Sequence, residues 1–482
     1  MSEHAGPRLG PRRPAADLVL PVALLGAAAI IVWLAPLGLR LQGFLAFATL
    51  ALCLGGAIYA VRSGMRPIAL IYFIFVFGWL GVAPVHQLAT GRLAWMDGVG
   101  RHPPDRVAYA LLMTVVAVAC FFGGHALAFG SSRSRAPGRQ RVSGRYLALF
   151  VVVALGGALL VVRALGGVAV LFSSRGERRE AMSVVAGDAG GLTLADALTG
   201  VLPAAAATAF ALLTISWLRA NHTRGSVRLR EIGVSATALV LLTLFANPLT
   251  TSRFIAVGAW GAAALALARP RSARAGWLLA TAGLLGVLIV YPYASLLGSR
   301  ADSTEQRQVG FEALVGPDFD GFQQIMNALA YVQAHGHSGG GYLVSSFAYV
   351  VPRSVWSDKA VPASIDIASD AGYWFTNLSL PVHAEFYVEF GWLGMGVAVF
   401  VLGWVCGRLD HAWHSGTTCV GAVIAPFVAL AMLGIVRGPM GSLLPIYATA
   451  LLLILLGLRP DHPGERNRRR VAADPQRHGP SP

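Results

Sequence analysis

The sequence predicts an all-α polytopic membrane protein, and three observations lead to this fold class. The 482 residues are 55% hydrophobic and only 13% charged, about half the charged share of a soluble domain. Apolar runs of roughly 18 residues or more recur along the chain, each long enough to cross a bilayer core. Short arginine-rich segments separate these runs, as is typical of loops between membrane spans.

About twelve transmembrane helices are predicted from these runs. They cover residues 16–37, 41–61, 67–88, 107–129, 146–166, 194–218, 232–250, 254–268, 277–298, 384–407, 417–436 and 440–458. The first follows Arg8, Arg12 and Arg13 and resembles a signal sequence. Its apolar part is too long for a cleaved signal, so we expect it to be retained as a helix.

The distribution of basic residues predicts that both termini are cytoplasmic. With this orientation, 24 of the 38 Lys and Arg residues lie in cytoplasmic segments and 13 in outer segments, while Arg163 lies within the fifth span. Cytoplasmic loops carry such an excess of positive charge. The net charge of +15 is therefore explained by these loops and their attraction to anionic lipid, and not by nucleic acid.

The spans divide the chain into four parts. Residues 1–298 form a membrane domain with nine helices, 299–382 a long extracytoplasmic loop, 383–458 a membrane domain with three helices, and 459–482 a basic cytoplasmic tail. A loop of 84 residues inside a compact protein is usually functional.

Apolar residues at helical spacing predict a short amphipathic helix inside the long loop. These residues are Phe319, Phe322, Ile325, Met326, Leu329 and Val332. The helix is expected either to lie on the outer leaflet or cap the bundle, or to pack on protein without lipid contact.

Arginines on the predicted outer side run against the usual charge bias, so they are candidates for substrate binding. Arg175, Arg178 and Arg179 follow Ser174 in the loop after the fifth span, at a predicted helix start. Free N–H groups and guanidinium groups at such a start suit an anion. The alternative is pairing with the neighbouring glutamates on a solvated face.

Arg253 is predicted to lie in the first turn of the eighth helix, after the capping residue Ser252. A cation there opposes the helix dipole, so an anionic partner would explain it better than local stability. The alternative is an arginine that reaches the lipid interface. Arg437, in the outer turn before the last span, is a candidate by the same reasoning.

His383, Glu385 and Glu389 lie at the entrance to the tenth span. Acidic groups at the edge of a membrane indicate function, and His383 or Glu385 could accept a proton from a hydroxyl group. The alternatives are a structural ion pair between Glu389 and an outer arginine, and an ordinary interfacial histidine at 383.

We expect no metal and no cofactor. Asp318 and Asp320 resemble a metal-binding pair of some glycosyltransferases, but two aspartates alone do not define a site. The sequence has no cluster of His, Cys and Asp at metal-ligand spacing and no phosphate-binding Gly-rich loop.

Four segments resemble the oligosaccharide repeat-unit polymerases, the Wzy-type O-antigen and capsular polysaccharide polymerases. The most specific spans 341–394, with Pro352-Arg353, Trp356 and Lys359, then Asn377-Leu-Ser379 leading to Glu385-Phe-Tyr387 and Phe390-Gly391-Trp-Leu-Gly394. The loop 173–179 and Ser252-Arg253 add to the resemblance. One departure is Ala360, where the family often has a second proline.

The resemblance implies a membrane glycosyltransferase of the bacterial cytoplasmic membrane, with its active site on the extracytoplasmic face. Such enzymes polymerise undecaprenyl-diphosphate-linked oligosaccharide repeat units, without nucleotide or metal. It implies that Arg175, Arg179, Arg253 and Arg353 bind diphosphate and that His383 or Glu385 is the base. Further substrate contacts are expected from Arg178, Lys359, Glu389 and Arg437. The resemblance also implies a flippase and a chain-length regulator as protein partners, in addition to the lipid bilayer.

Two alternatives remain open. An O-antigen ligase-like transferase shares substrate and topology but uses another acceptor, and the segment 352–359 favours the polymerase. A lipid-linked oligosaccharide flippase would need charge on both sides of the bundle and no long outer loop.

Overall fold

The computed structural model describes most of the chain as helices joined by short loops. The described residues are 40–62, 64–95, 98–131, 140–164, 166–172, 202–221, 229–248, 251–291, 310–349, 351, 355–373, 375–376, 378–415 and 420–460.

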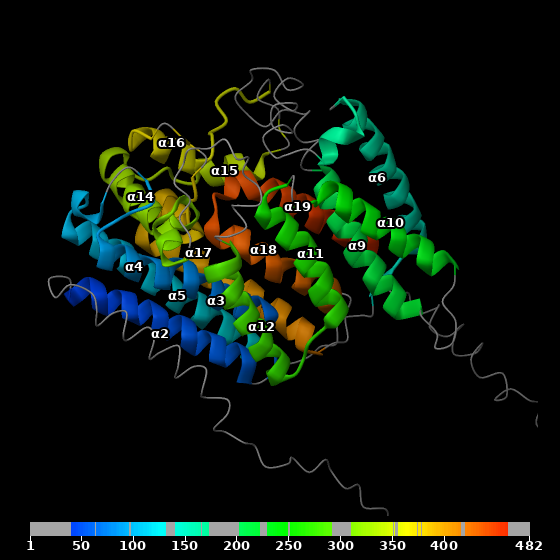
Figure 1. Ribbon diagram of the computed structural model, residues 1–482, viewed down its shortest axis with the longest axis horizontal. Helices are drawn as coiled ribbons and strands as arrows, with labels where there is room; N and C mark the ends of the chain where they lie inside the picture. The colour runs from blue at the N-terminus through cyan, green and yellow to red at the C-terminus, as the bar shows by residue number, and fades with distance from the viewer. Residues whose placement is uncertain are drawn as a thin grey trace, which may run out of the picture.

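Within the described residues, the regular secondary structure is helical apart from one short strand pair (Figure 1). The α-helices are α2 (Arg40–Arg62), α3 (Pro67–Val76), α4 (Ala83–Thr90), α5 (Pro104–Ser131), α6 (Gly144–Ala164), α9 (Leu202–Asn221), α10 (Leu229–Phe245), α11 (Arg253–Ala268), α12 (Ala273–Leu285), α14 (Gly321–His335), α15 (Gly341–Phe347), α16 (Ala363–Asp370), α17 (Val382–Ser415), α18 (Ala425–Arg437) and α19 (Met440–Gly457). The π-helical segments are η2 (Phe77–Val82), η6 (Gly286–Val290) and η9 (Val420–Ile424). The 3-10 segments are η3 (Val99–Arg101), η4 (Val168–Phe172), η7 (Gly310–Val315) and η8 (Pro317–Phe319). The antiparallel strands β1 (Gln140–Val142) and β2 (Leu458–Pro460) join the start of α6 to the end of α19.

Eight helical segments of the described chain are long and apolar enough to cross a membrane. They are Leu41–Arg62, Pro67–Thr90, Pro104–Gly130, Leu202–Ala220, Ala273–Val290, Val382–Ser415, Val420–Arg437 and Met440–Gly457. Two shorter apolar helices, Gly144–Leu160 and Arg253–Ala268, join them. The predicted all-α membrane fold is thus confirmed. The predicted span 16–37 lies outside the described residues, and the number twelve and the N-in/C-in orientation stay predictions.

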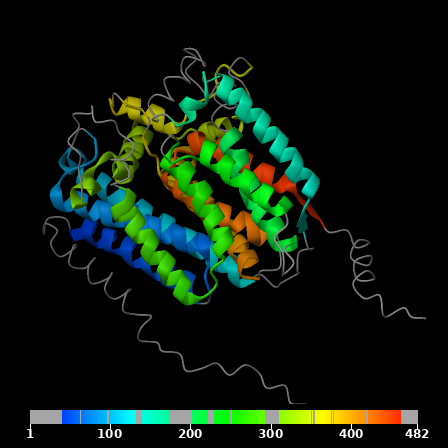
Figure 2. The same cartoon turned by 45° about the vertical axis from the view of Figure 1, so that its right-hand side comes forward.

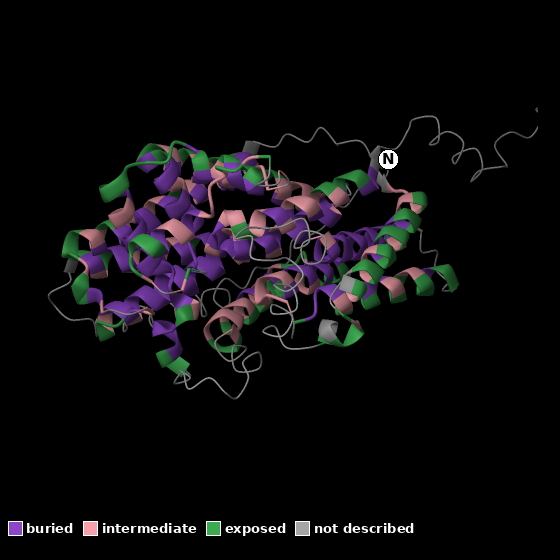
Figure 3. Ribbon diagram, turned by 90° about the horizontal axis from the view of Figure 1, so that it is seen from above, coloured by how far each residue is buried: buried purple, intermediate pink, exposed green. Residues whose placement is uncertain are grey.

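The helices pack around two neighbouring cores. One is formed mainly by α2, α3, α5 and α17, and the other mainly by α6, α9, α10, α11 and α19. Figures 1 and 2 both show α6, α9 and α10 gathered on the side of the bundle away from α2. Figure 3 shows buried residues along the centre, with exposed residues on the outer faces of the peripheral helices, as expected where helices meet lipid.

Helices α5 and α17 approach most closely, and glycines allow it. A Cβ on Gly124 would lie 2.1 Å from the carbonyl oxygen of Phe400, and one on Gly403 would lie 2.2 Å from that of Phe121. Small residues permit such backbone contact between membrane helices. This contact fixes α17, which carries three of the candidate site residues.

The described part of the long loop is folded onto one end of the bundle. Gln87 of α4 donates hydrogen bonds to the carbonyl oxygens of Leu314 (2.8 Å) and Phe319 (2.9 Å). The indole N–H of Trp79 donates to the carbonyl oxygen of Asp318 (3.0 Å). Because these carbonyls have buried partners, the segment before α14 has a fixed position.

The predicted amphipathic helix is confirmed as α14. Its residues Phe322, Ile325 and Met326 are buried, and it contacts α5 and α17. The apolar face therefore packs on protein, which was one of the two alternatives that the sequence left open.

Candidate functional site

Arg253 begins α11, as predicted, and Ser252 caps it by accepting a hydrogen bond from the N–H of Ile255 at 3.4 Å. The two terminal nitrogens of Arg253 donate to the two carboxylate oxygens of Asp318 at 3.1 and 3.2 Å. Nη1 also donates to the carbonyl oxygen of Tyr291 at 3.0 Å, and the guanidinium lies 4.8 Å from the Tyr291 ring. The anionic partner that the sequence called for is therefore Asp318.

This ion pair is partly exposed, since the Arg253 and Asp318 side chains are 29% and 25% exposed.

Arg437 is the last residue of α18 and lies near two aromatic residues, Phe254 and Tyr291. Its guanidinium is 5.1 Å from the ring of Phe254, and it also interacts with Tyr291. Its Nε is buried and has no hydrogen-bond partner in the described structure. The structure thus brings Arg253 and Arg437 together around Tyr291 and Phe254.

A glycine fixes the turn after Arg437. Gly438 has φ of 57°, and a Cβ there would lie 1.9 Å from the carbonyl oxygen of Leu380. The N–H of Leu380 donates to the carbonyl oxygen of Arg437 at 3.1 Å. The segment that enters α17 is therefore bound to the turn between α18 and α19.

Glu385 and His383 lie at this junction, and both are buried. Oε2 of Glu385 accepts a hydrogen bond from the N–H of Met440, the first residue of α19, at 2.8 Å. Its Oε1 and the Nε2 of His383 are buried without partners among the described residues. His383 also lines a small, mostly apolar cavity beside Tyr72 and Thr114. Two buried ionisable side chains thus lie next to the turn that carries Arg437.

Asp320 is buried at the start of α14. Its carboxylate accepts hydrogen bonds from the Ser379 hydroxyl, from the Ser379 N–H at 3.3 Å and from the Trp95 indole N–H at 3.2 Å. Burial raises the pKa of Asp320, while the positive charge of Arg437 and these hydrogen bonds oppose the rise. Asp318 thus binds Arg253, and Asp320 binds donors from two loops. Within the described residues, no group of side chains suited to a metal ion is found.

Glu389 binds the glycine-rich loop before α15. It accepts hydrogen bonds from the hydroxyl of Ser338 and from the N–H groups of Gly340 (2.8 Å) and Leu343 (2.5 Å). The sequence had suggested substrate or an outer arginine as its partner, but the structure gives it backbone groups at the start of a helix. Its role in substrate binding stays a prediction.

The remaining candidates lie apart or outside the described residues. Lys359 donates to the carbonyl oxygen of Val351 at 2.9 Å, in the loop between α15 and α16. Arg175, Arg178, Arg179 and Arg353 lie outside the described residues.

A second buried polar network was missed by the sequence analysis. His125 of α5 and Asp410 of α17 form a fully buried pair at 2.9 Å. Asp410 also accepts hydrogen bonds from the N–H groups of Ile68 (3.1 Å) and Ala69 (3.0 Å), at the start of α3. An ionisable residue within an apolar run is itself a signal, so a scan of the spans for His and Asp would have found it.

Fold and site together define a polytopic helical membrane protein with a cation-containing, partly buried polar site at one end of its bundle. A comparison with protein-family models finds no match, and neither curated proteins nor solved structures match the chain.

Proposed function

We propose that this protein is a membrane glycosyltransferase that polymerises undecaprenyl-diphosphate-linked oligosaccharide repeat units into a surface polysaccharide. The site is assigned to the outer face of the bacterial cytoplasmic membrane. The observation that carries the proposal is the convergence of Arg253 and Arg437 beside a buried Glu385 that has an unpartnered oxygen.

The two arginines suit the diphosphate of the lipid carrier. Guanidinium groups make strong charge-assisted hydrogen bonds to phosphate oxygens. Arg437 has a buried Nε without a partner, and Arg253 is partly exposed. In this proposal the diphosphate takes the place of the Asp318 carboxylate on Arg253.

Glu385 and His383 suit the role of general base. An acceptor hydroxyl of one lipid-linked unit attacks the anomeric carbon of the growing glycan, and its proton passes to Glu385 or His383. The bond between that carbon and the diphosphate oxygen breaks, and the lipid diphosphate leaves with the electron pair. Positive charge on the two arginines stabilises the leaving group.

A deletion strain tests the proposal through the state of its surface glycan. The proposal predicts single repeat units attached at the surface. Polymer stranded on the lipid carrier would indicate the ligase-like alternative, and a complete lack of exported units would indicate a flippase. Either of these results would contradict the polymerase.

A further inference from the structure

Helix α14 carries a stripe of polar side chains that faces the protein interior. The stripe consists of Asp320 at the helix start, then Gln323, Gln324 and Asn327, and their exposed fractions are 1%, 1%, 1% and 7%. Residues three, four and seven positions apart lie on one helix face. Burying polar groups costs free energy unless they are hydrogen-bonded, so this face calls for an explanation.

Two of the amides hold aromatic residues of neighbouring loops. Gln323 pairs with the backbone of Trp95, accepting from its N–H at 2.9 Å and donating to its carbonyl oxygen at 2.7 Å. Gln323 and Asn327 also donate to the hydroxyl of Tyr373 at 2.9 and 3.0 Å.

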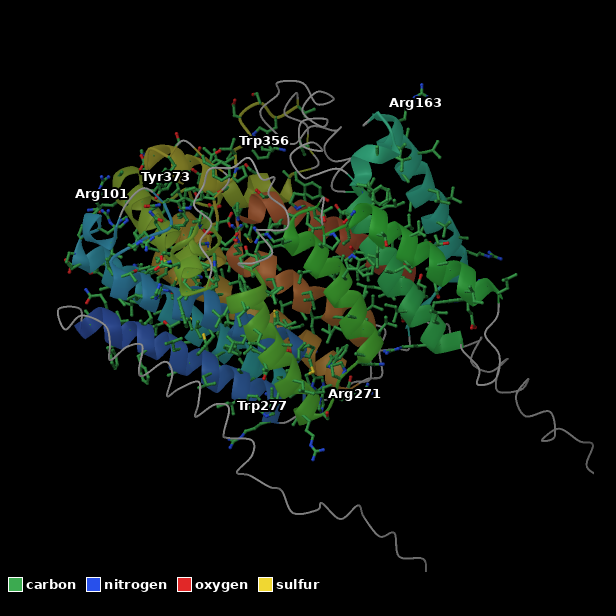
Figure 4. All side chains as sticks on the ribbon, viewed as in Figure 1. Arg101, Arg163, Arg271, Trp277, Trp356 and Tyr373 are labelled. Atoms are coloured by element: carbon green, nitrogen blue, oxygen red, sulfur yellow. The ribbon has the colours of Figure 1, made fainter. Side chains whose placement is uncertain are left out.

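Trp95 and Tyr373, held in this way, form a partly exposed aromatic group together with Phe375, which contacts the Trp95 ring. The Trp95 ring centroid lies 5.8 Å from that of Phe375 and 6.5 Å from that of Tyr373. None of the three residues is fully buried. Figure 4 shows Tyr373 at the upper end of the bundle, beside α14 and α16.

Packing of loops alone does not require this arrangement. Apolar contacts would anchor the loops at lower cost than buried amides, whereas hydrogen bonds to Trp95 and Tyr373 fix the orientation of their rings. Partly exposed rings in a fixed orientation are a preorganised binding surface. In addition, Nε2 of Gln324 is buried without a hydrogen-bond partner in the described structure, so the stripe holds a donor that lacks an acceptor.

The stripe also lies close to one of the arginines, Arg437. Trp95 donates its indole N–H to Asp320, and the charge of Arg437 acts on the same carboxyl group. A ligand with its anionic group on the arginines would therefore bring its next chemical group to the aromatic residues.

We propose that Trp95, Tyr373 and Phe375 bind the pyranose ring next to the diphosphate. This inference rests on the proposed function, because that function places the diphosphate at Arg253 and Arg437. The C–H face of a sugar ring packs on aromatic rings. These residues would then select which repeat unit is polymerised.

The test measures binding of the free repeat-unit oligosaccharide, released from its lipid by mild acid, to the full chain in nanodiscs. Saturation-transfer NMR reports contact with the sugar, and a titration gives Kd. We expect Phe375→Ala to weaken binding about tenfold. Phe347→Ala, at an exposed aromatic residue of α15, is the matched control and should bind as the wild type does. Phe375→Leu, checked for an unchanged melting temperature, replaces the alanine variant if that variant does not fold.

Absence of saturation transfer to the wild type, or equal Kd values for the wild type and the Phe375 variant, would overturn the inference. Binding of undecaprenyl diphosphate, which carries no sugar, is measured in parallel. It should be unchanged in the Phe375 variant and weakened in Arg253→Ala. If Arg253→Ala leaves it unchanged, the proposed function fails instead, so the two failures are distinguishable.

Discussion

Arg253 occupies a position that local energetics do not favour. A cation in the first turn of α11 opposes the helix dipole at a cost of about 0.3–1 kcal/mol. Its ion pair with Asp318 is partly exposed, and such pairs stabilise a fold by only about 0–1 kcal/mol. The two effects nearly cancel, so they do not account for this arginine, and the proposed function assigns it to the binding of an anionic substrate.

Replacement of Arg253 should therefore impair activity far more than stability. We expect Arg253→Ala to reduce glycan polymerisation by about 10²–10³-fold, by analogy with loss of an oxyanion donor. The melting temperature in detergent should change little. Arg253→Lys keeps the charge but loses the planar two-pronged geometry. If it supports normal chain length while the alanine variant does not, bidentate recognition is wrong and charge alone suffices.

Asp318→Asn tests whether the carboxylate competes with substrate for Arg253. Loss of the resident negative charge should tighten binding of undecaprenyl diphosphate about threefold to tenfold. Asp318→Glu keeps the charge and serves as the control. Weaker binding by the asparagine variant would mean that Asp318 positions the arginine instead of occupying its place.

Glu385→Gln separates the two candidates for the base. The amide oxygen can still accept the hydrogen bond from Met440, so the junction between α17 and α19 should persist. Loss of the base should lower the transfer rate by about 10²–10⁴-fold without weakening lipid binding. His383→Asn is assayed beside it with purified lipid-linked substrate. Full activity of the glutamine variant would leave His383 as the base.

At the scale of elements, the site depends on connections that hold α17 to its neighbours. The start of α17 is bound to the turn between α18 and α19 through Leu380 and Glu385. One turn further on, Glu389 holds the loop before α15. The helix is kinked at Gly391, which has φ of 69°, close to His337 of that loop.

Glu389→Ala should destabilise the protein, because it leaves buried N–H groups without an acceptor. A hydrogen bond to a charged group is worth about 1.5–3 kcal/mol, so we expect a loss of at least about 3 kcal/mol and a lower melting temperature. Asp358→Ala, at an exposed residue of the next loop, should have no such effect. An unchanged melting temperature for Glu389→Ala would contradict this structural role.

Sequence reasoning located helices well, because length and hydropathy are local properties. It placed α14 from its apolar spacing and the start of α11 from Ser252. It did not find the partners of the charged residues, because these come from distant segments. Arg253 meets Asp318 across 65 positions, and Glu389 meets Gly340 across 49. Contacts of this range depend on how the whole bundle packs.

At the scale of the whole molecule, loops predicted to share a side of the membrane lie at the same end. Figure 4 shows Arg101, Arg163, Trp356 and Tyr373 at the upper end and Arg271 at the lower end. The sequence assigned the first four to the outer side or to the outer end of a span, and Arg271 to the cytoplasmic side. Asp318, the partner of Arg253, lies on the same predicted outer loop as Tyr373, so exposure of the arginine site to the exterior depends on this assignment.

Labelling of single cysteines in intact cells tests the orientation most directly, in a background without the four native cysteines. Ser369→Cys lies on an exposed position of α16, and Ser415→Cys on an exposed position at the end of α17. We predict that a membrane-impermeant maleimide labels position 369 in intact cells and position 415 only after permeabilisation. Labelling in the reverse order would place the arginines on the cytosolic side, where the proposed reaction cannot take place.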